Sequence, residues 1–218
     1  EPGIQNIDLI KKNFATEYFE NFSSSNPCSE SLISVFGNCC LGSINLSNMY
    51  DEEKNEVNWS KLAYTIKLGI RFLDDVLTIN NYPIPETKIT AEASRRIGFG
   101  ILGLHYLLIK LGYKYGSEKS IEFIERLFTT IRNEAFDASC ELAKEKGSFP
   151  KLDIDKYLEN SFIQTLPTRI LKKIQRSGIR NAVLLAIAPT GTTSMVLGVS
   201  SGIEPIYAPI FNRRYRIN

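Results

Sequence analysis

The sequence is poor in the residues that build disulfide-rich or metal-rich proteins. It has four cysteines and one histidine in 218 residues, too few cysteines for a scaffold held together by disulfides. The cysteines form no paired CxxC motifs, and the histidine lies far from them in the chain, which disfavours a structural zinc site. We therefore expect reduced thiols, a cytoplasmic location and no bound metal.

Long apolar runs and an excess of either charge are also absent. No run approaches the roughly 20 apolar residues of a membrane-spanning helix, and the first ten residues do not resemble a signal peptide. Lys and Arg number 26 against 24 Asp and Glu, which gives no electrostatic reason to expect nucleic-acid or membrane binding. A hydrophobic fraction of 43% is enough for a folded core.

Neither end of the sequence resembles a natural terminus, so we expect an excerpt of a larger protein. The arginines near the end, Arg213, Arg214 and Arg216, would be a surface patch or part of a continuation.

Helices dominate the predicted secondary structure from residue 59 to residue 176. Apolar residues three and four positions apart predict a helix over 59–79, ended by Pro83 and Pro85. A second helix is expected over 93–111, where close packing would offset the cost of about 1 kcal/mol for each internal glycine. Ser117 and Gly147 are typical caps of a third helix over 117–146, and a shorter helix is expected over 167–176.

A short apolar run at residues 182–188 predicts a strand that is buried on both faces. It leads directly into the loop sequence PTGTTS at residues 189–194. A strand followed by a loop rich in Gly, Thr and Ser is typical of α/β proteins, which bind ligands at the carboxyl ends of strands. The hydroxyl and N–H groups of the loop suit a phosphate, especially if a helix begins there. The lysine of a P-loop is absent, and an ordinary polar turn is an equally good interpretation.

The segment NPCSE at residues 26–30 carries an amide, a thiol and a carboxylate at alternate positions. Pro27 favours an extended conformation for the residue before it. In an extended loop, the side chains of Asn26, Cys28 and Glu30 would project to the same side. That combination suits redox or radical sulfur chemistry assisted by a general base, and the simpler alternative is a turn with a half-buried cysteine.

The other three cysteines have different interpretations. Cys140 lies on an apolar face of the third helix, and we expect it to pack in the core, as we do Cys40. One of the adjacent pair Cys39 and Cys40 would be able to form a disulfide with Cys28 or with a cysteine elsewhere.

Two further groups of polar residues are interpreted as structural. His105 is expected to be a helix residue with a satisfied hydrogen bond. Asp74 and Asp75 point in different directions on a helix, so we prefer solvation or capping of neighbours to a metal site.

Together and in this order, the motifs resemble those of the catalytic (large) subunit of ribonucleotide reductase. The matching segments are NPCSE (26–30), CCLGSINL (39–46), IRFLDD (70–75), RRIGFG (95–100), APTGTTS (188–194) and SSGIEP (200–205). The forms PTGT and SSGIEP are most similar to those of the adenosylcobalamin-dependent, class II, enzymes.

The resemblance implies an α/β fold, namely part of a ten-stranded α/β barrel with a central finger loop. The whole chain, residues 1–218, would be the C-terminal portion of that catalytic barrel and would be helix-rich. The finger loop would span about 22–46, the helical region about 59–176, and the strand with its phosphate loop about 182–205.

The resemblance also implies a reduction of ribonucleotides to 2′-deoxyribonucleotides. Cys28 would be the transient thiyl radical that abstracts the 3′-hydrogen, Glu30 the general base on the 3′-hydroxyl, and Asn26 a hydrogen-bond partner of the sugar hydroxyls. Cys39 would be the redox cysteine because it lies three residues before Gly42, as in the family. The substrate would be held by Ser25, Pro189, Thr190, Gly191, Thr192 and Thr193.

The implied cofactor is adenosylcobalamin, and the implied partners are a thioredoxin-like dithiol reductant, the rest of the chain and a second copy in a homodimer. The second redox cysteine would lie upstream and a reducing cysteine pair downstream, so we expect the 218 residues alone to be inactive. Three alternatives stay open. The first is a class I subunit with a dimetal radical-generating partner, the second an inactive nucleotide-binding relative, and the third an unrelated helical module without the strand at 182–188.

Overall fold

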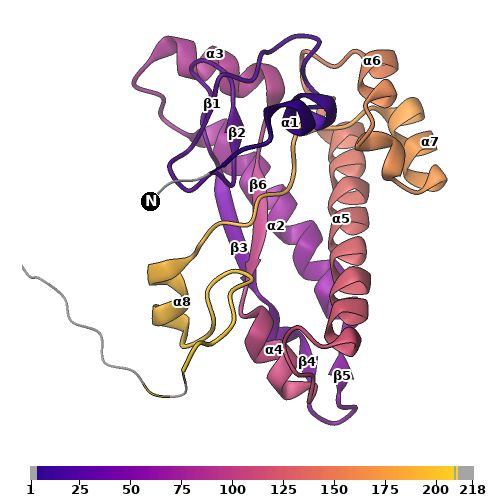
Figure 1. The fold of residues 1–218 in the computed structure, drawn as a ribbon. Coiled ribbons are helices and arrows are strands. Elements are labelled where there is room, and N and C mark those ends of the chain that lie inside the picture. The colour runs from indigo at the N-terminus through magenta and orange to yellow at the C-terminus, as the bar shows by residue number, and fades with distance from the viewer. Residues whose placement is uncertain (1–3, 209, 211–218) are drawn as a thin grey trace, which may run out of the picture.

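The computed structural model describes residues 4–208 and 210. The predicted arginine patch at Arg213, Arg214 and Arg216 lies outside these residues. The short strands lie in the first half of the chain, and helices make up nearly all the regular structure after β6 (Figure 1). The elements are α1 (Ile7–Asn13), β1 (Ser24–Ser25), β2 (Leu32–Ile33), β3 (Leu41–Asn45), η1 (Leu46–Met49), β4 (Tyr50–Asp51), β5 (Glu56–Val57), α2 (Trp59–Ile79), α3 (Pro85–Ser94), β6 (Gly98–Leu102), α4 (Leu104–Lys110), α5 (Glu118–Lys146), α6 (Ile154–Glu159), η2 (Ile163–Thr165), α7 (Thr168–Ser177) and α8 (Gly191–Leu197).

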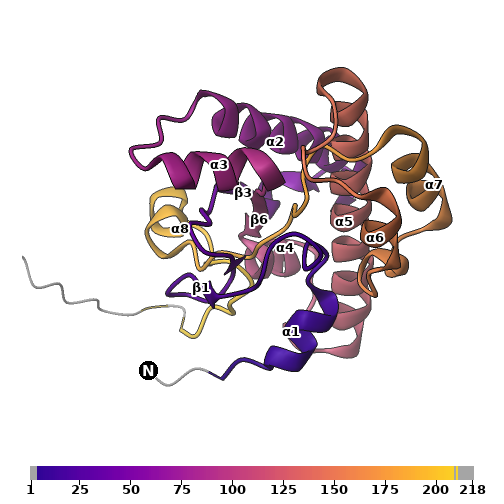
Figure 2. The ribbon, with the colours of Figure 1, turned by 90° about the horizontal axis from the view of Figure 1, so that it is seen from above.

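Two long helices form the framework of the molecule. α2 and α5 pack against each other, and α2 also packs against β3. Both helices occur where the apolar spacing predicts them, and the Ser117 hydroxyl caps α5 by accepting a hydrogen bond from the backbone N–H of Ser120. Seen from above, α2 and α3 lie on one side of β3 and β6, whereas α1 and β1 lie on the other (Figure 2).

The predicted helix over 93–111 is wrong in its middle. Residues 98–102 form the strand β6, which pairs in parallel with β3 along the whole length of both strands. A Cβ atom at Gly100 would lie 2.3 Å from the carbonyl oxygen of Ala186, and one at Gly98 would lie 2.4 Å from Leu41 Cδ2. The glycines therefore allow β6 to approach its neighbours closely, and this tertiary packing overrides the helical spacing of the apolar residues.

The segment 182–188 lies beside β6, but its regular pairing is shorter than predicted. The backbone N–H of Phe99 donates to the Leu184 carbonyl oxygen at 2.7 Å, and the N–H of Ala186 donates to the Phe99 carbonyl oxygen at 3.1 Å. One parallel bridge, between Phe99 and Leu185, is formed. Burial on both faces is also wrong, because Val183 and Leu185 are only half-buried. Residues 182–186 line a cavity.

The strands of the described residues form three separate two-stranded sheets, and no closed barrel is present among them. The parallel pair β3–β6 and the segment beside it are the α/β part of the structure, while helices make up most of the rest (Figure 1). Within residues 4–208, no helix has both the length and the apolar character needed to cross a membrane.

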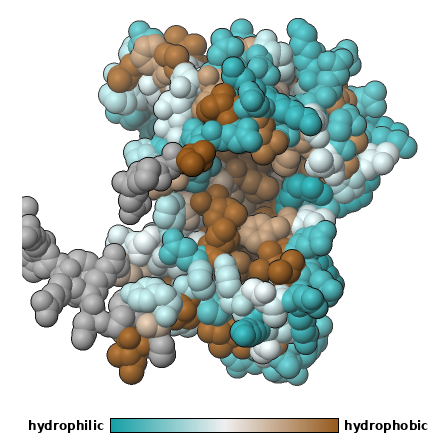
Figure 3. Space-filling view, in the orientation of Figure 1, coloured by the Kyte–Doolittle hydropathy of each residue, from teal (hydrophilic) through white to brown (hydrophobic). Residues whose placement is uncertain are grey.

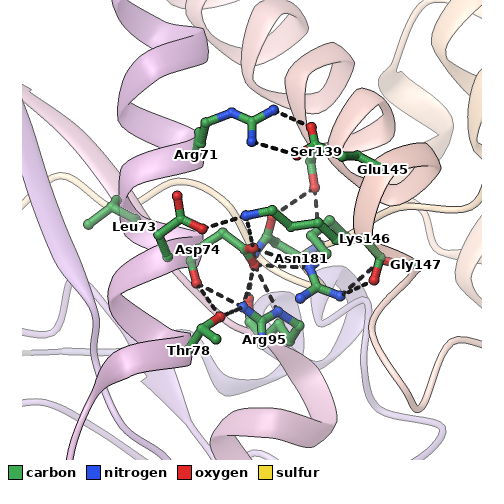
Figure 4. A network of polar contacts seen from close by, with 12 residues as sticks. Arg71, Leu73, Asp74, Thr78, Arg95, Ser139, Glu145, Lys146, Gly147 and Asn181 are labelled. Carbon is green, nitrogen blue, oxygen red and sulfur yellow. Dashed lines mark hydrogen bonds and ion pairs between the residues drawn. The ribbon is translucent and has the colours of Figure 1, made fainter.

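A buried ionic network anchors the segment that enters this α/β part. Asp74 on α2 is completely buried and binds Arg95, Arg180 and Lys146, and it also accepts a hydrogen bond from Asn181 Nδ2 at 3.1 Å (Figure 4). The expectation that Asp74 is solvated is therefore wrong. The network ties α2 and the end of α5 to the residues just before 182–188, so it fixes where that segment begins.

Candidate functional site

The residues Asn26 to Ser31 form a hairpin turn between β1 and β2. The Asn26 backbone N–H donates to the Ser31 carbonyl oxygen at 3.2 Å, and Asn26 Oδ1 accepts a hydrogen bond from the Ser31 N–H at 3.0 Å. Ser29 has a φ of 64°, in the left-handed region. The predicted extended conformation of this segment is therefore wrong, because the Asn26 side chain closes a turn.

Glu30 and Cys39 line the same cavity, which has a volume of about 340 Å³. Glu30 lies at the end of the hairpin turn, and Cys39 lies two residues before β3. The cavity is otherwise lined mainly by apolar side chains, and apolar residues gather in a hollow near the centre of the molecular face shown in Figure 3. A carboxylate and a thiol thus share one apolar site.

One oxygen of Glu30 has an unusual environment. The atom Oε2 is buried and has no hydrogen-bond partner among the described residues. A buried carboxylate oxygen without a partner is costly, and such groups are retained where they have a chemical task. The oxygen is therefore available to a ligand that enters the cavity.

The remaining catalytic candidates do not line this cavity. Cys28 is at the tip of the turn and is exposed, while Asn26 is half-buried. Ser25 lies on β1, where its hydroxyl accepts a hydrogen bond from Gln5 Nε2 at 2.9 Å and lies 3.2 Å from the Ser29 hydroxyl. The thiol of Cys28 and the hydroxyls of Ser25 and Ser29 thus lie within five residues of Glu30 in the sequence, on the same hairpin.

The two interior cysteines differ from the two exposed ones. Burial raises the pKa of the Cys140 thiol to about 12, and it also raises the pKa of Cys40, whose Sγ lies 3.7 Å from the Leu73 carbonyl oxygen. Both are free thiols packed in or against the core, which confirms the structural interpretation. Cys28 and Cys39 are exposed free thiols, whereas Cys40, which also lines the cavity, is half-buried and has a raised pKa that disfavours its thiolate.

The loop after residue 188 leads into a helix, as the phosphate interpretation requires. Thr190 precedes α8 with a φ of 51°, and its hydroxyl accepts a hydrogen bond from the backbone N–H of Gly202 at 2.8 Å. Gly191, Thr192 and Thr193 are exposed on the first turn of α8. Backbone N–H groups at the start of a helix have no partner within the helix, so they can bind an anion.

The loop at 189–194 is not part of the cavity lining, so the structure does not unite it with Glu30 and Cys39. It is connected to them through the segment 182–186, whose residues line the cavity before the chain reaches Pro189. The predicted parts of the site therefore occupy two places, the cavity beside the hairpin and the start of α8, which are joined along the chain by residues 182–190.

His105, near these elements, has a structural role. His105 Nδ1 accepts a hydrogen bond from the Ile206 N–H at 2.7 Å, and burial lowers the pKa of the imidazole. This confirms that His105 is a satisfied helix histidine. Within the described part of the chain, no group of three or more His, Cys, Asp or Glu side chains could hold a metal ion.

The sequence reasoning gave no role to Arg96, which also lines the cavity. It is 7% exposed and forms an ion pair with Glu20. The paired arginines of RRIGFG were the available signal, because a charged residue beside a buried glycine-rich strand needs a partner.

Comparison with known proteins gives a family match over almost the whole chain. The family model described as the barrel domain of ribonucleotide reductase matches residues 1–217. A vitamin B12-dependent ribonucleoside-diphosphate reductase of Mycobacterium tuberculosis is 35% identical over 213 residues, which are 98% of this chain and 28% of that protein. The protein of the same name from Thermoplasma acidophilum is 34% identical over 215 residues, covering 98% and 26%.

A further relative has a different name. The ribonucleoside-diphosphate reductase subunit alpha of Chlamydia pneumoniae is 34% identical over 221 residues, which cover 91% of this chain and 20% of that subunit. The chain thus spans between a fifth and about 28% of the length of these curated relatives.

Proposed function

Because the chain belongs to the ribonucleotide reductase barrel-domain family, we propose that it carries out part of the reduction of ribonucleotides to 2′-deoxyribonucleotides. The observation that supports this most is the buried, unpartnered Oε2 of Glu30 on a cavity shared with the free thiol of Cys39. A base and a reducing thiol beside one small-molecule site suit this reaction.

In the proposed reaction, each residue has a separate task. The Cys28 thiyl radical takes the 3′-hydrogen of the ribose, and Glu30 accepts the proton of the 3′-hydroxyl. The 2′-hydroxyl leaves as water with a proton from the Cys39 thiol. Cys39 and a second thiol outside these 218 residues supply two electrons and become a disulfide. Cys28 then returns the hydrogen to C3′, which regenerates its thiyl radical. Asn26 Nδ2 remains available for the sugar hydroxyls, because only Oδ1 of its side chain is used to close the turn.

The substrate phosphates would bind to residues of the hairpin strand β1 and of the loop before α8. We assign them to Ser25 and to the loop of Pro189, Thr190, Gly191, Thr192 and Thr193. The exposed N–H groups at the start of α8 support this assignment. The Mycobacterium and Thermoplasma relatives are named diphosphate reductases.

We also propose that the parallel pair β3–β6 and the segment 182–188 are strands of a ten-stranded barrel completed by further chain. The barrel-domain match and the parallel order support this, because parallel strands with both edges open need neighbours. The segment 22–46, which contains the hairpin, would be the finger loop. A cytoplasmic location, a thioredoxin-like reductant and a homodimer complete the proposal.

Adenosylcobalamin is the proposed radical source, because the Mycobacterium and Thermoplasma relatives are named B12-dependent. A cavity of about 340 Å³ is at the lower end of the roughly 300–1,000 Å³ range of small-ligand pockets. This volume suits a nucleotide better than it suits the larger corrinoid, so the described residues do not by themselves form the cofactor site. The cofactor would supply the first radical, and the residues of this chain would orient the sugar and move its protons.

The test is a reconstitution of the full-length protein with ribonucleotide, adenosylcobalamin and a dithiol, without any second subunit. Deoxyribonucleotide formation is the expected result. Activity that strictly requires a second, metal-containing protein would instead support the class I alternative. The similarity to the Chlamydia subunit alpha is the reason to test this alternative. Nucleotide binding without turnover under both conditions would support an inactive relative.

A further inference from the structure

The hairpin that carries Cys28 and Glu30 has little secondary structure of its own. Its strands β1 and β2 have two residues each. A two-stranded hairpin is at best marginally stable in water, even when it is longer than this one. Contacts from outside the hairpin must therefore hold it in one position.

Gln5 Nε2 donates hydrogen bonds to hydroxyls on the exposed side of the hairpin, and the buried outside contact comes from Arg96, which lies between α3 and β6. Its Nη1 donates a hydrogen bond to the carbonyl oxygen of Leu32 at 3.0 Å, and its Nη2 forms an ion pair with Glu20. The guanidinium also lies over the ring of Phe14, 5.3 Å from its centroid. Leu32 is the first residue of β2, two residues after Glu30.

Glu20 contacts the other end of the same strand. Its Oε2 accepts a hydrogen bond from the hydroxyl of Ser34 at 2.9 Å, while its Oε1 binds Arg96. The side chains of Glu20 and Arg96 are each only 8% exposed. The pair therefore holds β2 on both sides, at Leu32 and at Ser34, in a place that excludes water.

Arg96 is itself anchored to the centre of the molecule. The preceding residue, Arg95, is held by Asp74 in the buried network, and the N–H of the following residue, Ile97, donates to the Val183 carbonyl oxygen at 3.0 Å. Arg96 therefore fixes the position of the hairpin relative to β6 and the segment 182–186. Arg96 and Glu30 also line the same cavity.

We propose that Arg96 and Glu20 are positioning residues that hold the hairpin with Cys28 and Glu30 at a fixed place beside the cavity. The inference rests on the proposed function for its effect on turnover, but not for its effect on the hairpin. Only arginine has the planar fork that can bind a carboxylate and a carbonyl oxygen at once. A displacement of about 1 Å at a reacting group can lower a rate by roughly a hundredfold.

The test is Arg96→Lys in the full-length protein. Lysine retains the charge opposite Glu20 but loses the fork, so the hydrogen bond to Leu32 should be lost. We expect kcat to fall about tenfold or more, with KM changed by less than about twofold, because the chemical step suffers more than binding. We also expect hydrogen exchange at the amides of Asn26, Ser29 and Ser31 to become about tenfold faster or more.

Arg95→Lys is the matched control, because Arg95 is also 7% exposed and also pairs with a buried carboxylate, Asp74. It has no described contact with the hairpin and acts on it only through the backbone next to Arg96, so it should lower the stability but change kcat and the exchange of the hairpin amides less than Arg96→Lys does. Equal effects of the two variants on kcat and exchange would overturn the proposal. If Arg96→Lys does not fold, the second variant is Ser34→Ala, which removes only the hydrogen bond from Ser34 to Glu20 at the other end of β2. Hydrogen exchange at the hairpin amides should still become faster in this variant. Unchanged exchange would overturn the proposal.

The two proposals fail in different ways. Absence of turnover in the wild-type protein, with all cofactors present, would contradict the proposed function. Hairpin exchange that is the same in Arg96→Lys and wild type would contradict the positioning role, whatever the turnover.

Discussion

Asp74 Oδ1 accepts a hydrogen bond from Arg95 Nε at 2.8 Å, and the Asp74 side chain is completely buried. The same oxygen accepts a hydrogen bond from Asn181, 107 residues further along the chain. This carboxylate therefore joins α2, the residue after α3 and the start of the segment at 182–188, around which the site is arranged (Figure 4).

Removing the charge of Asp74 should destabilise the protein strongly. Asp74→Asn leaves the buried Arg95 and Arg180 without their shared counter-charge, and breaking a buried ion pair costs about 3–5 kcal/mol. Urea denaturation measures this as a loss of unfolding free energy. Asp75→Asn is the matched control, because Asp75 is 51% exposed and its ion pair with Lys146 should contribute no more than about 1 kcal/mol. Equal losses for the two variants would contradict the importance of the buried network.

Gly100 should not tolerate a side chain. In Gly100→Ala the new Cβ would lie 2.3 Å from the backbone oxygen of Ala186, which cannot move without disturbing the pairing of β6 with that segment. We expect a loss of stability of about 1–3 kcal/mol, the usual range for overpacking, measured by thermal unfolding. Gly42→Ala is the control on β3, because its Cβ would meet only the flexible side chain of Leu73 at 3.1 Å. A Gly100→Ala variant as stable as the wild type would show that the approach is not as close as described.

The four cysteines should react in two groups. Alkylation requires the thiolate, and burial raises the pKa of Cys140 to about 12 and also raises that of Cys40. At pH 8, mass spectrometry after brief iodoacetamide treatment should therefore show Cys28 and Cys39 modified first. Cys140 should react only after unfolding in urea, which is the internal control. Rapid labelling of Cys140 in the folded protein would contradict the core packing.

The sequence predicted the helices well where one face alone is apolar. α2, α5 and α7 follow their apolar spacing and caps, because local signals and tertiary packing agree there. The failure at β6 has the opposite cause. Residues 98–102 are buried on every side, so their apolar spacing does not distinguish a strand from a helix, and only the partner β3 decides between them.

The candidate site was predicted by residue type and not by geometry. The pattern of Asn26, Cys28 and Glu30 identified the segment, but the turn closed by Asn26 Oδ1 depends on a hydrogen bond that the pattern does not encode. The buried state of Asp74 was visible in principle, since it is four residues after Ile70 and three before Leu77 on the core face of α2. Its partner Arg180 is 106 residues away in sequence, and no local rule connects the two.

The central claim is that Cys28 performs the chemistry of ribonucleotide reduction while other residues bind the substrate. The most direct measurement compares wild type and Cys28→Ser in the full-length protein, with deoxyribonucleotide formation assayed beside equilibrium binding of the ribonucleotide. Serine keeps the size and polarity of the side chain but cannot form a thiyl radical. The predicted result is loss of all measurable reduction with the dissociation constant changed by less than about threefold, which corresponds to under about 0.7 kcal/mol. Reduction that survives the substitution would contradict this assignment.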